Sequence, residues 1–147
     1  MEKDFDDWNN VKKNVNKMPE VFGVHQRELW WVSFGINIGV EIDGKHETFE
    51  RPAIVLRRFN RDMVWVLPVT SQSKNIPFYE RFSYEGRDYW AVLTQLRTVS
   101  TKRFLRKIGM IPKEHFRAMQ EKLTAFVLTE ENERNPAQGG VPRRPKP

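Results

Sequence analysis

The sequence contains no cysteine, and this absence excludes several classes of protein site at once. Without thiols the chain cannot form disulfides, use a cysteine nucleophile or bind zinc through cysteine. Its three histidines, His25, His46 and His115, are scattered along the chain without the spacing of a metal site. We therefore expect no bound metal and no cofactor.

Long apolar runs are missing as well. No segment approaches the roughly 20 apolar residues of a membrane-spanning helix, so no membrane association is expected. The N-terminus, MEKDFDDWNN, is acidic and does not resemble a secretory signal, which favours a cytoplasmic protein. The 25 Lys and Arg outnumber the 19 Asp and Glu, and a net charge of +6 is typical of proteins that meet nucleic acid or acidic surfaces.

Composition divides the 147 residues into three parts. Trp8, Val11 and Val15 recur at helical spacing before Pro19, so residues 1–26 are predicted to be an N-terminal helical extension. We favour a helix packed on the main domain over a helix that binds a partner. Residues 130–147 are basic, rich in Pro and Gly and nearly free of apolar side chains, which predicts a disordered tail.

The central part, residues 27–129, is predicted to be mainly β with one C-terminal helix after Pro112. Short apolar or aromatic runs separated by turn residues predict strands at Glu28–Phe34, Pro52–Leu56, Met63–Val69, Phe78–Tyr84 and Tyr89–Leu93, with a continuation or a further strand at Thr94–Ser100. Five or six such strands suggest a small bent sheet or β-barrel, because closure removes exposed edges. Trp30, Trp65 and Trp90 lie inside apolar runs and are expected in the core.

One predicted hairpin carries polar chemistry at one end. Arg51 stands at the start of its first strand, and Thr70 and Ser71 stand at the end of its second. In an antiparallel pair the start of one strand lies beside the end of the next, so these side chains should meet. A guanidinium next to hydroxyls favours a phosphate site. The alternative is that Arg51 forms a surface ion pair with Glu50 or Glu41.

The connection before this hairpin, Gly35–Glu50, is long for a compact domain, and such loops are often functional. It carries two candidates for a general base, Glu41 and His46. A lone histidine in a loop is more often only solvated, and the choice between the two residues stays open.

Four segments, ELWWVSFGINIGVE, RPAIVLRR, VLPVTSQ and TQLRTVSTKRFLRKIG, follow one another along the chain. In this order they resemble the MazF/PemK toxins of bacterial type II toxin–antitoxin systems, over about residues 27–128. The resemblance implies an SH3-like barrel (CcdB/PemK-like) that forms a homodimer. It also implies a metal-independent mRNA interferase, an endoribonuclease that cuts single-stranded RNA at selected sequences. A cognate antitoxin protein would block the RNA groove.

Matched by position, the resemblance implies catalytic roles for Arg51, Thr70 and Glu41. Residues expected to bind substrate are Ser71, Gln72, Lys74, Gln95, Arg97 and His46. Gln95 has a second interpretation, in which its amide holds a loop in place rather than contacting RNA.

Three features depart from the family pattern. Ser100 stands where the family often has Asp. The other two bear on function. The loop between Glu41 and Arg51 is longer, and Thr94 stands where many members carry a carboxylate. These departures favour an alternative function, a non-catalytic barrel that binds nucleic acid or protein. A toxin that inhibits a topoisomerase is a third possibility, which the ribonuclease motifs make weaker.

Overall fold

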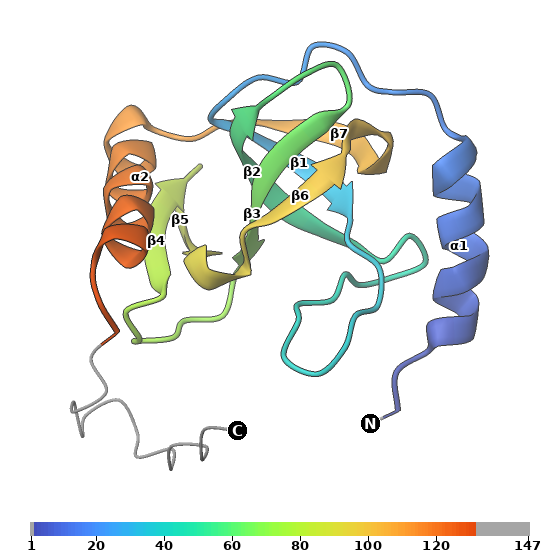
Figure 1. Cartoon of the computed structure of the whole chain (residues 1–147), viewed down its shortest axis with the longest axis horizontal. Coiled ribbons are helices and arrows are strands. Elements are labelled where there is room, and N and C mark those ends of the chain that lie inside the picture. Colours follow the sequence, from blue (N-terminus) through green and yellow to red (C-terminus); the bar gives the residue numbers. More distant parts are fainter. Residues whose placement is uncertain (1, 132–147) are drawn as a thin grey trace.

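The computed structural model describes residues 2–131. A twisted sheet lies between two helices, α1 (Phe5–Lys17) and α2 (Lys113–Leu128), which flank it on opposite sides (Figure 1). The strands are β1 (Glu28–Ser33), β2 (Glu50–Arg58), β3 (Met63–Thr70), β4 (Tyr79–Tyr84), β5 (Arg87–Val92), β6 (Arg97–Ser100) and β7 (Phe104–Met110). Two short 3₁₀ turns, η1 (Leu93–Gln95) and η2 (Thr101–Arg103), flank β6.

The strand order is β4-β5-β3-β2-β1-β7, with β6 also paired to β3, and the paired strands are antiparallel. In the described part of the chain β4 and β7 do not pair, so the closed barrel expected from the sequence is not seen. Helix α2 packs against β4 and contributes Phe116 and Met119 to the core. The helix therefore covers apolar surface that paired strands would cover in a closed barrel.

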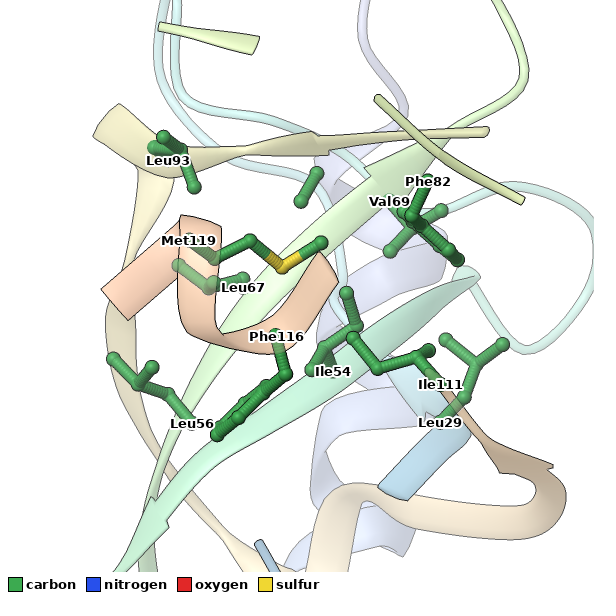
Figure 2. Packing of buried hydrophobic residues seen from close by; sticks show 11 residues of the cluster. Leu29, Ile54, Leu56, Leu67, Val69, Phe82, Leu93, Ile111, Phe116 and Met119 are labelled. Carbon is green, nitrogen blue, oxygen red and sulfur yellow. The ribbon is translucent and has the colours of Figure 1, made fainter. Parts of the chain in front are cut away.

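The core consists of two clusters, one on each face of the central strands. Ile54 and Leu56 of β2 belong to the first cluster, whereas Ala53 and Val55 belong to the second. Strand side chains alternate between faces, so burial of both faces explains the continuous apolar run in β2. In the first cluster Met119 of α2 lies close to residues of the sheet (Figure 2).

The sheet differs from what the sequence predicts in two places. Trp65 is 38% exposed, because it alternates with buried Val64 and Val66 and its ring therefore points to the other face. Strand β7 was not predicted, since its basic residues obscure the apolar pattern. Two of them, Arg106 and Lys107, form ion pairs with Glu50 and Glu28.

Helix α1 begins after Asp4, whose carboxylate accepts a hydrogen bond from the Asp7 N–H at 3.0 Å. Its Trp8 is buried, and the helix runs beside the loop that joins β1 to β2 (Figure 1). None of the helices in residues 2–131 has the length and apolar character needed to cross a membrane. From residue 132 onward, the predicted disordered tail lies outside the described residues.

Candidate active site

Strands β2 and β3 bring Arg51 and Thr70 together as the sequence predicts. Ala53 pairs with Pro68, and the same register continued by two residues places Arg51 opposite Thr70. The Arg51 Nε–H donates to the main-chain carbonyl of Asp43 at 2.7 Å, and Nη1 donates to that of Val69 at 3.3 Å. Two carbonyls therefore fix the orientation of the guanidinium.

The ion-pair alternative for Arg51 is not what the structure shows. The carboxylate of Glu50 binds Arg106 instead, with Nη2 and Oε2 at 2.6 Å. The Glu41 carboxylate accepts a hydrogen bond from the Ile38 N–H at 3.1 Å. Across residues 2–131 no carboxylate lies within ion-pair distance of Arg51. Its remaining N–H groups can therefore serve a ligand.

The electrostatics of Arg51 follow from its partial burial. Burial lowers the pKa of the guanidinium, and the nearby Asp43 carboxylate and Tyr79 side chain act in the opposite direction. An arginine at neutral pH nevertheless stays charged. The structure thus holds a cation partly out of water, where its attraction for an anion is stronger than at an exposed surface.

A cleft of about 410 Å³ opens beside Arg51. Polar residues that line it are Lys45, His46, Glu50, Arg51, Thr70, Ser71, Tyr84, Glu85, Arg87 and Tyr89. The Thr70 hydroxyl oxygen accepts a hydrogen bond from the Gln72 N–H at 3.2 Å, so the hydroxyl proton can be donated to another acceptor. This cleft can therefore present a guanidinium and a hydroxyl to one phosphate group.

The two candidates for the general base lie in different places. His46 lines the Arg51 cleft. Glu41 lines two other hollows, of about 300 and 520 Å³, and Arg97 lines both of them. Burial lowers the pKa of Arg97 and the nearby Glu41 carboxylate opposes that shift, so Glu41 acts on Arg97 electrostatically. A catalytic role for Glu41 stays a prediction that the geometry of the Arg51 cleft does not favour.

Gln95 spans the gap between η1 and the β1–β2 loop. Its Oε1 accepts from the Ile42 N–H at 3.2 Å, and its Nε2 donates to the Val40 carbonyl at 2.9 Å. Both ends of the amide are thus used on the loop backbone. This geometry supports the interpretation that Gln95 positions the loop.

A second basic region lies under α1. Arg97 and Arg103 line the 520 Å³ hollow together with Lys12 and Asp6 of α1. Burial, together with the charge of Arg97, lowers the pKa of Arg103 to about 10. Two guanidiniums that line one hollow attract anionic groups.

Sequence reasoning missed part of the cleft and included residues outside it. Lys45, Tyr84 and Arg87 line the cleft but were not predicted. Nothing local shows that the irregular β1–β2 loop brings Lys45 beside Arg51, or that the β4–β5 hairpin brings Tyr84 and Arg87 there. Lys74 is exposed and does not line the cleft. Gln72 does not line the cleft either, and its main-chain N–H donates to the Thr70 hydroxyl oxygen. Within residues 2–131 no group of three acidic or histidine side chains is placed to hold a metal ion.

Comparison with known proteins gives the family and the fold. Residues 25–127 match the PemK-like, MazF-like toxins of type II toxin–antitoxin systems. No curated protein sequence matches the chain.

Solved structures resemble this one at low identity. MazF from Deinococcus radiodurans is 20% identical with a TM-score of 0.60, over 73% of this chain and 98% of that one. The Mycobacterium tuberculosis toxin MazF-mt6 is 16% identical with a TM-score of 0.53, over 71% and 100%. A mycobacterial endoribonuclease in complex with its cognate antitoxin is 11% identical with a TM-score of 0.57, over 74% and 100%. At these identities the likeness shows the fold alone. Since the family match spans more than half of its length, the chain belongs to the PemK-like, MazF-like toxins of type II toxin–antitoxin systems.

Proposed function

We propose that this toxin is a sequence-selective endoribonuclease that cuts single-stranded RNA without a metal ion. The observation that carries the proposal is the set of contacts that Arg51 makes. Two backbone carbonyls orient its guanidinium, and within residues 2–131 no carboxylate forms an ion pair with it. Its free donors share a cleft with Thr70 and Ser71. The fold likeness to a mycobacterial endoribonuclease supports the same activity.

In this reaction the ribose 2′-oxygen attacks the adjacent phosphorus while the bond from phosphorus to the 5′-oxygen breaks. The products are a 2′,3′-cyclic phosphate and a 5′-hydroxyl, with one proton removed from the 2′-hydroxyl and one delivered to the leaving oxygen. Negative charge develops on the phosphoryl oxygens in the transition state. Arg51 and the Thr70 hydroxyl are placed to donate hydrogen bonds to those oxygens, which stabilises that charge.

For the proton transfers we propose His46 as the first candidate. Histidine is the side chain whose charge changes most readily near neutral pH, and His46 lines the Arg51 cleft. Glu50 is a poorer base. Its burial acts to raise the pKa, but hydrogen bonds from Arg106 and Thr48 outweigh burial and leave the pKa lowered. A carboxylate stabilised in this way accepts a proton weakly.

The partners belong to the same proposal. RNA on either side of the cut would contact the basic hollow of Arg97 and Arg103. A cognate antitoxin with an acidic segment would compete for these basic surfaces, and MazF from Deinococcus radiodurans is known in structures of MazE-MazF. The active form would be a homodimer, as the family resemblance implies.

The decisive test is incubation of the purified protein with a long single-stranded RNA in EDTA, with the cut ends mapped by primer extension. Arg51→Ala is the test variant, and Arg117→Ala, which removes an exposed arginine of α2, is the matched control. We expect discrete cuts by the wild type and the control, and none by Arg51→Ala. RNA binding without cuts by the wild type would instead support the non-catalytic binding domain.

A further inference from the structure

The N-terminal segment, which precedes the family match, is tied to the β1–β2 loop by Lys3. Its Nζ donates to the carbonyls of Asn37 at 2.7 Å and Gly39 at 3.2 Å, and lies 3.1 Å from Asp43 Oδ2. An ammonium group has three N–H donors, and all three have acceptors within residues 37–43 of this one loop. Lys3 therefore does more than form a single surface ion pair.

Trp8 provides a second attachment five residues later. Its ring is buried, lies edge-on to Phe49 with centroids 5.6 Å apart, and covers Gly35 so closely that a Cβ there would meet the ring at 2.3 Å. Gly35 and Phe49 are at the two ends of the β1–β2 loop. Helix α1 thus packs on the base of the loop while Lys3 holds its middle.

The loop held in this way is the one that orients Arg51. One carboxylate oxygen of Asp43 forms an ion pair with Lys3. The other accepts a hydrogen bond from the Asn37 N–H at 2.6 Å. The main-chain carbonyl of the same Asp43 accepts the Arg51 Nε–H at 2.7 Å. One residue therefore connects the N-terminal segment to the guanidinium at the cleft.

We infer that residues 3–17 act as a built-in brace of the Arg51 site, with Lys3 as a positioning residue that fixes Asp43 and through it the Arg51 guanidinium. The inference rests on the proposed ribonuclease function for its kinetic consequence, but its structural part is independent of that function. Loss of the Lys3 contacts loosens the loop at Asp43, although Gln95 still holds Val40 and Ile42, and Arg51 then samples orientations that do not face the cleft. The cost falls on the catalytic step, because a reacting group held out of position lowers kcat.

The test compares three variants of the full-length protein. Lys3→Gln removes the charge, Lys3→Arg keeps it, and Lys13→Gln is the matched control at an exposed lysine of α1. The first readout is the NMR signal of the Arg51 Nε–H, assigned by its loss in Arg51→Lys. We expect its exchange with solvent to rise about tenfold in Lys3→Gln, the effect of losing the charge-assisted contact with Asp43, and to stay unchanged in Lys13→Gln.

The second readout is steady-state cleavage of RNA. We expect kcat to fall about tenfold in Lys3→Gln with KM nearly unchanged, and Lys3→Arg to restore kcat. An unchanged Arg51 signal in Lys3→Gln overturns the inference. Faster exchange with unchanged kcat in an active protein also overturns it, because Arg51 would then not depend on the brace. If the wild type does not cut RNA, the proposed function fails, and the Arg51 signal still decides whether the brace exists.

Discussion

Replacement of Arg51 by lysine tests whether the shape of the guanidinium matters as well as its charge. Arg51 directs Nε to the Asp43 carbonyl and Nη1 to the Val69 carbonyl, and its other donors remain for the cleft. A lysine ammonium is a single point and cannot serve both carbonyls and a phosphate at once. Loss of one pre-oriented donor to a developing anion costs roughly 10²–10³ in rate, or about 2.7–4 kcal/mol.

The same substitution should affect stability much less. Two carbonyls lose a hydrogen-bond donor, at about 1 kcal/mol each, and the side chain is only partly buried. We therefore expect the free energy of unfolding to fall by about 1–3 kcal/mol while the rate falls by two orders of magnitude or more.

The assay is single-turnover cleavage of a short RNA that contains a mapped site, with enzyme in excess and EDTA present. Arg51→Lys and Arg51→Ala are compared with Arg117→Lys as the control, and urea unfolding confirms that each variant folds. If Arg51→Lys stays within about threefold of the wild type, a point charge is sufficient and the argument from the guanidinium geometry is refuted.

Three further predictions follow from single contacts. Thr70→Val keeps the volume but removes the hydroxyl, so single-turnover cleavage should slow by about a hundredfold, whereas Thr70→Ser should keep most of the rate; a Val variant as fast as the wild type would exclude a donor role. Glu28 is buried, and burial acts to raise its pKa, but hydrogen bonds from Lys107, the His25 N–H and Trp30 outweigh burial and leave the pKa below 4.5. A carboxylate whose pKa is lower in the folded state stabilises the fold at pH values above its unfolded-state pKa. This stabilisation is lost as the pH falls through the folded-state pKa. Glu28→Gln should therefore lower the free energy of unfolding by about 1–3 kcal/mol near pH 7, and the difference from the wild type should shrink below pH 4.5; a difference independent of pH would show that the charge is not responsible. Gly35 and Gly39 both have positive φ, but only at Gly35 would a Cβ meet Trp8, so Gly35→Ala should be less stable than Gly39→Ala by about 1–3 kcal/mol in urea unfolding, and equal stabilities would contradict the packing of α1.

Some of the candidate site was predictable from the sequence because it depends on local pattern and simple topology. The apolar runs on either side of residues 57–62 predict an antiparallel hairpin, and the hairpin forms as β2 and β3. Once two adjacent strands are antiparallel, the start of the first must lie near the end of the second. This is why Arg51 and Thr70 could be placed together before any tertiary contact was known.

Other parts of the site depend on contacts between residues far apart in the chain. The long β1–β2 loop has no regular pattern, so its sequence did not show that His46 lines the Arg51 cleft while Glu41 lies beside Arg97. The same limit hid Arg87, which reaches the cleft from the β4–β5 hairpin. Side-chain direction in such a loop is set by long-range hydrogen bonds, such as the pair from Gln95.

What the sequence determined by itself is the type and order of most elements, the absence of thiol chemistry and the hairpin end that carries Arg51. Only the tertiary contacts show that the sheet formed by residues 2–131 is not closed beside α2, that β7 forms despite its basic residues, and that Lys3 reaches a loop 34 to 40 positions away. The physical reason is the range of the forces involved. Backbone propensity and apolar periodicity act over a few neighbouring residues, whereas packing, ion pairs and loop hydrogen bonds depend on which distant segments the fold brings together.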